Sequence, residues 1–233
     1  MNHQPNEPSR VFQFLKGFQM STTDFSSRTL SRSIAVLLIA TSTIGLVGPR
    51  LQAADLLLTD GFTSDKKTNR RALRGDWLIS AGVAACVQDD TLYKKYKNHG
   101  PIIFYDLPYD DVSVRFAIKP QQTKTVVFTA NGADGHIFRA VWAESGLTVR
   151  AFPPSSQKKS ISVGKSPEAI PSENEWLPIE IQLRGETAII KSGNKVLQAE
   201  HPSFKRPKQN LSIGFSFGSL AVKDLSVTAL SSP

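Results

Sequence analysis

Residues 175–197, EWLPIEIQLRGETAIIKSGNKVL, decide the fold. Leu177, Ile179, Ile181 and Leu183 alternate with Pro178 and polar residues, which is the period of a strand with one buried face. The polar triplets Arg184-Gly185-Glu186 and Ser192-Gly193-Asn194 each follow an apolar run. Glycine supplies the positive φ that tight hairpins need. The stretch therefore predicts two consecutive β-hairpins.

The same period-two pattern runs through the chain after residue 54, and nowhere does helical spacing persist over eleven residues. About fourteen short strands are too many for one open sheet, so we expect an all-β, two-sheet antiparallel β-sandwich of the jelly-roll type over residues 55–230. The predicted strands are Leu56–Leu58, Trp77–Ser80, Val83–Gln88, Ile102–Tyr105, Val112–Ile118, Thr125–Ala130, His136–Ala143, Leu147–Phe152, Ser160–Val163, Leu177–Leu183, Thr187–Lys191, Val196–Glu200, Leu211–Phe217 and Leu220–Ala229.

Three of these strands predict the core. Their alternate apolar residues are Val112, Val114, Phe116 and Ile118; Leu177, Ile179, Ile181 and Leu183; and Leu211, Ile213, Phe215 and Phe217. In the last strand the apolar positions change from even to odd numbers near Lys223-Asp224, which predicts a β-bulge there.

The N-terminus has the organisation of a signal peptide. Residues 34–47 form an apolar run of about fourteen residues, shorter than a comfortable membrane span, preceded by Arg28 and Arg32. Small residues at Ala53 and Ala54 predict cleavage there, and a start at Met20 would give an n-region of ordinary length. We therefore expect residues 1–53 to be removed and the protein to be exported to the periplasm or beyond, with no stable membrane span. An uncleaved N-terminal anchor is the alternative.

The net charge and the cysteine content limit the classes of function that the protein can have. The full chain carries a net charge of +8 and one cysteine, Cys86, so an intrachain disulfide is excluded. The apolar neighbours of Cys86 predict a buried, unreactive thiol. We expect no metal site and no cofactor. His99, His136 and His201 lack ligand spacing, and Asp60 with Asp224 would supply too few oxygens for calcium. Export would also separate the protein from nucleic acid.

Several fragments carry a resemblance, and they occur in this order: GDWLISAGVAAC, HGPIIFYDLPYDDVSVRFAIK, GHIFRAVWAESGLTVRAF, EWLPIEIQLRGETAIIKSGNKVL, AEHPSFKRPKQNLSIGF and LAVKDLSVTAL. Together they resemble secreted bacterial concanavalin A-like, laminin-G-like β-sandwiches related to the 3-keto-disaccharide hydrolases. The resemblance spans roughly residues 56–230 and implies that the protein binds or processes carbohydrate. The chain departs from this pattern because it lacks the Gly-Ile, Glu-x-Gln-Ile and Gly-Ala-Ile-Tyr segments expected of clear hydrolase members.

The sequence offers no convincing pair of catalytic carboxylates. It lacks Glu-x-Asp-x-Glu, the strand motif by which jelly-roll glucanases place their carboxylates on one face. Glu173 and Glu175 approach it most closely, but their loop-like context favours a solvated surface pair. The irregular segment from Pro153 to Asn174 is either a lid over a ligand or a simple connection. We therefore leave the catalytic residues unassigned.

Sugar sites combine planar polar groups with an aromatic platform, and the strand GHIFRAVW with its neighbours supplies the best set. The candidate ligand-binding residues are Arg115, His136, Arg139, Trp142 and Arg150. In a regular strand Arg139 faces away from His136 and Trp142, so they share a surface only if a bulge intervenes. The alternative places Phe138, Ala140 and Trp142 in the core.

A second candidate is the basic, tyrosine-containing segment LYKKYKNHG at residues 92–100, which either binds an anionic polysaccharide or is a solvated loop. Three functions are consistent with these observations. The first is a secreted glycan-binding sandwich with degenerate catalysis, and the second is a 3-keto-disaccharide hydrolase. The third is a cell-surface protein-interaction module.

Overall fold

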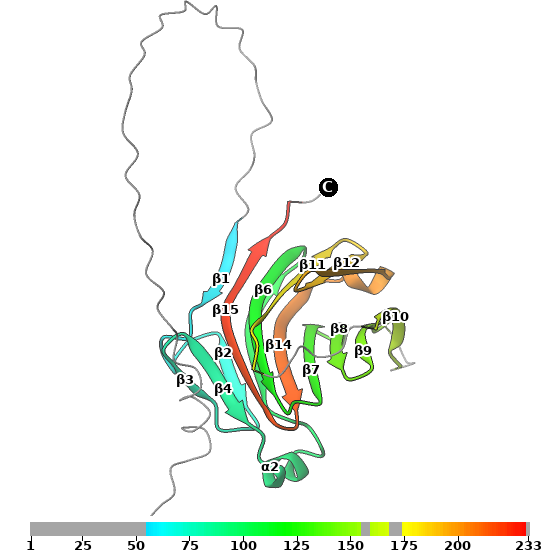
Figure 1. Cartoon of the computed structure of the whole chain (residues 1–233). Coiled ribbons are helices and arrows are strands. Elements are labelled where there is room, and N and C mark those ends of the chain that lie inside the picture. The colour runs from blue at the N-terminus through cyan, green and yellow to red at the C-terminus, as the bar shows by residue number, and fades with distance from the viewer. Residues whose placement is uncertain (1–54, 155–158, 168–173, 232–233) are drawn as a thin grey trace, which may run out of the picture.

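A computed structural model describes residues 55–154, 159–167 and 174–231. Two antiparallel sheets, of eight and seven strands, pack face to face in this part of the chain (Figure 1). The predicted signal segment lies outside the described residues, as do residues 155–158 and 168–173 of the segment from Pro153 to Asn174, Glu173 among them. The prediction of a two-sheet antiparallel β-sandwich is confirmed.

The eight-stranded sheet is built around two long central strands. Its order is β13 (Lys195–Glu200), β12 (Thr187–Ser192), β11 (Leu177–Arg184), β6 (Val112–Gln121), β15 (Ser219–Ala229), β4 (Val83–Val87) and β3 (Leu78–Ser80), while β1 (Leu56–Asp60) pairs with β15. The hairpins β11–β12 and β12–β13 are the two predicted at the outset. Gly185 and Gly193 turn them with φ of 53° and 60°.

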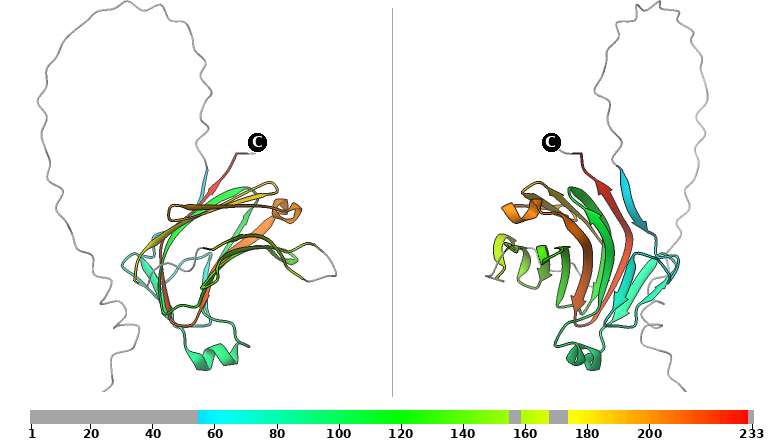
Figure 2. Two further views of the ribbon diagram at one scale, coloured as in Figure 1. Left: turned by 45° about the vertical axis from the view of Figure 1, so that its right-hand side comes forward. Right: turned by 180° about the vertical axis from the view of Figure 1, so that it is seen from behind.

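The seven-stranded sheet has the order β10 (Ile161–Ser166), β9 (Gly146–Ala151), β8 (Gly135–Ala143), β7 (Thr125–Gly132), β14 (Lys208–Ser216), β5 (Ile102–Tyr109) and β2 (Arg70–Leu73). Both sheets bend in the same sense, as nested arcs, with the seven-stranded sheet on the inside of the curve (Figure 2). The outer face of the seven-stranded sheet is therefore concave.

The core lies between the sheets, as the alternation predicted. Val114, Ile181 and Ile213 are all buried, together with most of the other apolar residues named for these strands. Leu177 is only half-buried. Phe217 is also an exception, because it lies in the turn after β14 with φ of 64° and packs against Tyr93 of helix α2 (Asp90–Lys95) instead of facing inward.

The predicted bulge is also present. The register between β15 and β6 shifts between Lys223 and Ser226, and Asp224 adopts a positive φ of 54°. The change from even to odd apolar positions follows from this extra residue.

The sequence missed three short elements. β2 has only four residues, and α2 has six, too few for periodicity to reveal. Asp89 caps α2 by accepting a hydrogen bond from the backbone N–H of Leu92 at 2.8 Å. Another short helix, η1 (Pro202–Lys205), follows β13, where His201-Pro202 ends the strand.

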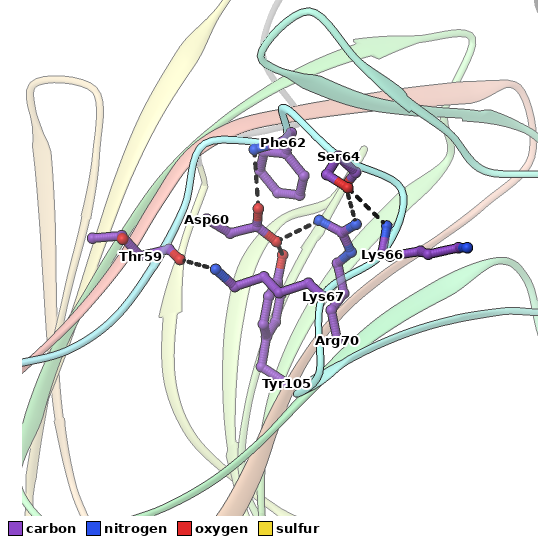
Figure 3. A network of polar contacts seen from close by, with 8 residues as sticks. All are labelled: Thr59, Asp60, Phe62, Ser64, Lys66, Lys67, Arg70 and Tyr105. Atoms are coloured by element: carbon purple, nitrogen blue, oxygen red, sulfur yellow. Dashed lines mark hydrogen bonds and ion pairs between the residues drawn. The ribbon is translucent and has the colours of Figure 1, made fainter.

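A buried ion pair joins the two sheets at one end (Figure 3). Asp60, at the end of β1, accepts hydrogen bonds from Arg70 of β2 at 2.7 Å and from the Tyr105 hydroxyl of β5 at 2.8 Å. The side chains of Arg70 and Asp60 are only 1% and 4% exposed. Asp60 therefore neutralises a buried cation, while Asp224 is exposed and pairs with Lys223.

Cys86 of β4 is buried in the core, as predicted, and burial raises the pKa of its thiol to about 12. Within the described ranges no helix is long and apolar enough to cross a membrane. In the same part of the chain no three His, Cys, Asp or Glu side chains gather into a possible metal site.

Candidate functional site

Polar side chains form two rows across the concave outer face of the seven-stranded sheet. Ser212, Thr129, Arg139 and Arg150 are register neighbours on β14, β7, β8 and β9. In the second row, Asn210, Asn131 and His136 are neighbours on β14, β7 and β8. Residues directly opposite in an antiparallel pair project from the same face, so each row presents its side chains together.

A β-bulge makes this arrangement possible. The register between β7 and β8 shifts so that Ala130 pairs with Phe138 while Asn131 pairs with His136, which leaves Ile137 as the extra residue. Both Ile137 and Phe138 are buried, and His136 and Arg139 consequently project from the same face. The sequence required such a bulge for these two residues to meet.

The two rows are connected by hydrogen bonds. Arg139 Nη2 contacts His136 Nε2 at 2.7 Å, and His136 Nδ1 contacts Asn131 Oδ1 at 2.5 Å. Asn131 Nδ2 donates to Asn210 Oδ1 at 2.7 Å, while Arg139 Nε donates to Thr129 Oγ1 at 3.3 Å. The chain from Asn210 to Thr129 therefore holds five polar side chains in fixed orientations.

The chemistry of this chain fixes the protonation state of His136. A guanidinium group can only donate, so His136 Nε2 must accept and Nδ1 carries the proton that is donated to Asn131. Desolvation and the positive charge of Arg139 both lower the pKa of His136. The imidazole is therefore neutral at pH 7.

A pocket of about 210 Å³ lies beside these rows on the same face. Its lining includes Thr125, Val127, Thr129 and Arg139 of β7 and β8, together with Arg74 and His99. Its polar groups are hydroxyls, amide, imidazole and guanidinium, and its apolar lining includes Val127. A pocket of mixed apolar and hydrogen-bonding character suits a small polar ligand with one apolar side.

Two of the five candidate residues from the sequence lie elsewhere. Trp142 is 1% exposed in the core, where its Nε1 donates to Ser192 Oγ at 3.2 Å, so the core alternative describes it correctly. Arg115 lies on the outer face of the other, eight-stranded sheet, where it pairs with Glu180 at 3.0 Å. The structure thus brings together His136, Arg139 and Arg150, and it separates Arg115 and Trp142 from them.

The eight-stranded sheet carries a larger pocket, of about 440 Å³, lined by Arg115, Glu180 and Lys191 among others. We favour the smaller pocket as the site because the charges of the larger one already satisfy one another. Burial alone would raise the pKa of Glu180, but hydrogen bonds from Gln182, Arg115, Lys191 and Ser113 outweigh it and lower this pKa to about 2. A ligand there would have to replace these contacts.

The segment LYKKYKNHG contributes only its end to the site. Its first part forms α2, where Tyr93 packs on Phe217 with ring centres 5.4 Å apart. Asn98 and His99 line the 210 Å³ pocket. Binding of an anionic polysaccharide by the lysines and tyrosines of this segment stays a prediction.

Sequence reasoning missed Thr129, Asn131 and Asn210. The sequence does show polar residues at alternate positions of these strands: Thr125, Thr129 and Asn131 in β7, and Asn210 and Ser212 in β14. Polar residues on the outer face of a strand are common, however, and only the neighbouring strands show that these form one row.

Solved structures of other proteins share the fold of this chain. The carbohydrate-binding module CBM66 from Bacillus subtilis superposes with a TM-score of 0.54 at 9% identity, covering 70% of this chain and 96% of that one. The CBM2 module of the evolved Dit protein of Lactobacillus casei BL23 phage J-1 gives 0.56 at 8% identity, covering 76% and 97%. This chain has a concanavalin A-like β-sandwich fold.

A Bacillus subtilis protein of unknown function with a galectin-like fold is similar as well, with a TM-score of 0.57 at 11% identity, covering 77% of this chain and 98% of that one. No protein-family model matches the sequence, and no curated protein matches it significantly. At such low identities these likenesses establish the fold, and the relation to 3-keto-disaccharide hydrolases stays a prediction.

Proposed function

We propose that the protein is an exported glycan-binding β-sandwich that holds its ligand on the concave outer face of the seven-stranded sheet. The observation that carries this proposal is the hydrogen-bonded chain from Asn210 through Asn131 and His136 to Arg139, beside a pocket of about 210 Å³. Sugar hydroxyls both donate and accept hydrogen bonds, and this chain presents amide, imidazole and guanidinium groups that are already oriented. Pre-orientation reduces the ordering cost of binding.

Two further considerations support glycan as the ligand. The pocket is lined both by apolar side chains such as Val127 and by hydroxyl-bearing ones such as Thr125, and a pyranose ring likewise presents both apolar and polar surface. Two of the solved structures reported above are named carbohydrate-binding modules. This second point is an analogy of fold, and the local geometry carries the proposal.

The decisive experiment is a glycan array of neutral and acidic polymers, followed by calorimetric titration of the hits. Arg139→Gln, which removes a pocket-lining guanidinium, is expected to weaken binding about tenfold or more, the size expected for charge-assisted hydrogen bonds. Arg184→Gln, at the far end of β11, is the matched control and should bind like the unmodified protein. If no glycan binds, or if both variants bind equally well, the proposal is wrong.

Arg115→Gln distinguishes the structural assignment from the sequence-based one. Arg115 lies on the opposite sheet, so its loss should leave the affinity unchanged. A loss of affinity comparable to that of Arg139→Gln would move the site to the eight-stranded sheet and its pocket of about 440 Å³.

The exported location rests on the N-terminal sequence, because residues 1–54 lie outside the described part of the chain. Mass spectrometry of the protein purified from its native host should find an N-terminus close to Ala54. A mature protein that retains residues 34–47 would instead support the uncleaved anchor.

A further inference from the structure

Two arginines face each other on the proposed binding surface. Arg139 of β8 and Arg150 of β9 are directly paired in register and are both half-buried. Like charges directly opposite in a sheet are destabilising, and desolvation increases their repulsion. The structure accordingly places two cations together at some cost in stability.

Neither arginine has a carboxylate partner among the ion pairs of the described residues. Arg139 hydrogen-bonds to His136 and Thr129, and its guanidinium lies over the ring of Phe152, 5.3 Å from the ring centre. Arg150 donates to Ser160 through its Nε at 2.8 Å.

Four other arginines in that part of the chain each form an ion pair with an acid: Arg70, Arg71, Arg115 and Arg206. Arg184 has no acid among these ion pairs either, but its register partner is Thr187 and not a second arginine. What distinguishes Arg139 and Arg150 is that two half-buried cations face each other without a counter-charge.

Both guanidinium groups retain N–H donors for a ligand. The contacts of Arg139 use its Nε and one Nη2 position, and those of Arg150 are directed to Ser160 through Nε and Nη2. An arginine has five donors in a planar fork that matches the oxygens of carboxylate or sulfate. The lowered pKa of Arg139, caused by desolvation and by the charge of Arg150, agrees with this shortage of negative charge.

We propose that Arg139 and Arg150 together bind the anionic group of an acidic sugar unit, either a uronate carboxylate or a sulfate ester. This inference rests on the proposed function and specifies its ligand class. The anion would lie over the cross-strand pair on β8 and β9, while the sugar ring would extend toward Val127 and Thr129 in the pocket. Because His136 is neutral, the two arginines would supply the positive charge at this position.

The test compares charged and uncharged forms of the same polymer. Oligogalacturonates are measured against their methyl esters, and dextran sulfate against dextran, by calorimetric titration at two salt concentrations. The unmodified protein is expected to prefer at least one charged form by about tenfold or more, with the preference falling as salt rises. The galacturonate arm reports carboxylate recognition, and the dextran arm reports sulfate recognition.

Arg150→Gln is the informative variant because Arg150 does not line the pocket. It should reduce the preference for the charged polymer about tenfold or more, because only Arg139 then remains to bind the anionic group. Because the Arg150→Gln variant removes one of two like charges that face each other, its melting temperature should equal or exceed that of the unmodified protein. Arg184→Gln, with the same change in net charge, should retain the preference.

The failures of the two proposals are distinguishable. If neutral and charged polymers bind equally, or if Arg150→Gln keeps the charge preference, the anion site is wrong while glycan binding stands. If Arg150→Gln unfolds at a clearly lower temperature, Arg150 has a structural role and the inference fails. If neither form of any glycan on the array binds, the proposed function is wrong and the anion site with it.

Discussion

At the scale of single residues, His136 is held between a group that can only donate and an amide oxygen that can only accept. Desolvation and the charge of Arg139 lower its pKa, so we expect its imidazole to titrate with a midpoint below the ordinary value of 6.5. Nuclear magnetic resonance of the ring protons would measure this midpoint. In Arg139→Gln the midpoint should rise, because one of the two causes is removed.

The same shift fixes the sign of a pH effect on stability. Above pH 6.5 both folded and unfolded His136 are neutral, and below it the unfolded chain takes up the proton first. The contribution of His136 to stability is therefore present above 6.5 and declines as the pH falls toward its folded pKa. A His136 midpoint at or above 6.5, or one that does not move in Arg139→Gln, would contradict the hydrogen-bonded chain.

The ion pair of Asp60 and Arg70 predicts a large effect on stability. Asp60→Asn would leave the Arg70 guanidinium buried without a counter-charge, and removing one partner of a buried pair costs about 3–5 kcal/mol. Urea denaturation followed by circular dichroism measures the change in the free energy of unfolding.

The matched control is Asp106→Asn, which breaks the pair of Asp106 with Arg71. Their side chains are 48% and 46% exposed, so the loss should be only about 0.2–1 kcal/mol. Equal losses in the two variants would show that the pair of Asp60 and Arg70 is hydrated in solution.

At the scale of elements, two hairpin glycines allow a controlled comparison. Gly185 and Gly218 have φ of 53° and 60°, so alanine meets the same backbone penalty of about 1–2 kcal/mol at both. A Cβ at Gly185 would meet nothing within 4 Å, whereas at Gly218 it would approach the carbonyl oxygen of Gln121 to 2.2 Å. We expect Gly218→Ala to lower the free energy of unfolding clearly more than Gly185→Ala. Equal losses would mean that the β14–β15 turn can shift away from Gln121.

The elements differ in how well the sequence could predict them. β11 and β12 were predictable because most of their alternating apolar residues are buried and each turn contains a glycine. β2 was not, because its buried residue is Arg70, whose charge is matched only by Asp60 ten residues away in sequence. α2 has six residues and no buried side chain, so no apolar stripe marks it.

At the scale of the whole molecule, alternation shows which residues of a strand share a face, but it does not show to which of the two sheets the strand belongs. Arg115 and Arg139 both face solvent from strands with buried alternate residues, yet they lie on opposite faces of the molecule. Alternation showed that Trp142 and Arg139 project from opposite faces of a regular strand, but it did not show which face lies in the core. Both placements of Trp142, in the core and on the binding surface, were therefore left open. The order of strands, which long-range pairing determines, was the missing information.

Cys86 reports whether the sandwich unfolds as a unit. β4 lies between β15 and β3, and burial, together with the nearby charge of Asp76, raises the pKa of the Cys86 thiol from 9.0 to about 12. Because the thiolate is the reactive form, iodoacetamide at pH 8 should modify the folded protein very slowly. The unfolded chain would lose its thiol proton first as the pH rises above 9.0, so this contribution to stability is present below that value and declines above it.

We expect alkylation of Cys86 to increase with urea along the same curve as the loss of the β signal in circular dichroism, because exposure of a residue with 0% accessible surface requires the two sheets to separate. Modification in fully denaturing urea gives the upper limit of the rate. If alkylation begins at urea concentrations where the β signal is intact, the end of the eight-stranded sheet formed by β3 and β4 opens independently. The prediction that the two sheets unfold cooperatively would then be wrong, because the part of the core that Cys86 shares with Ile79 and Ala84 would open first.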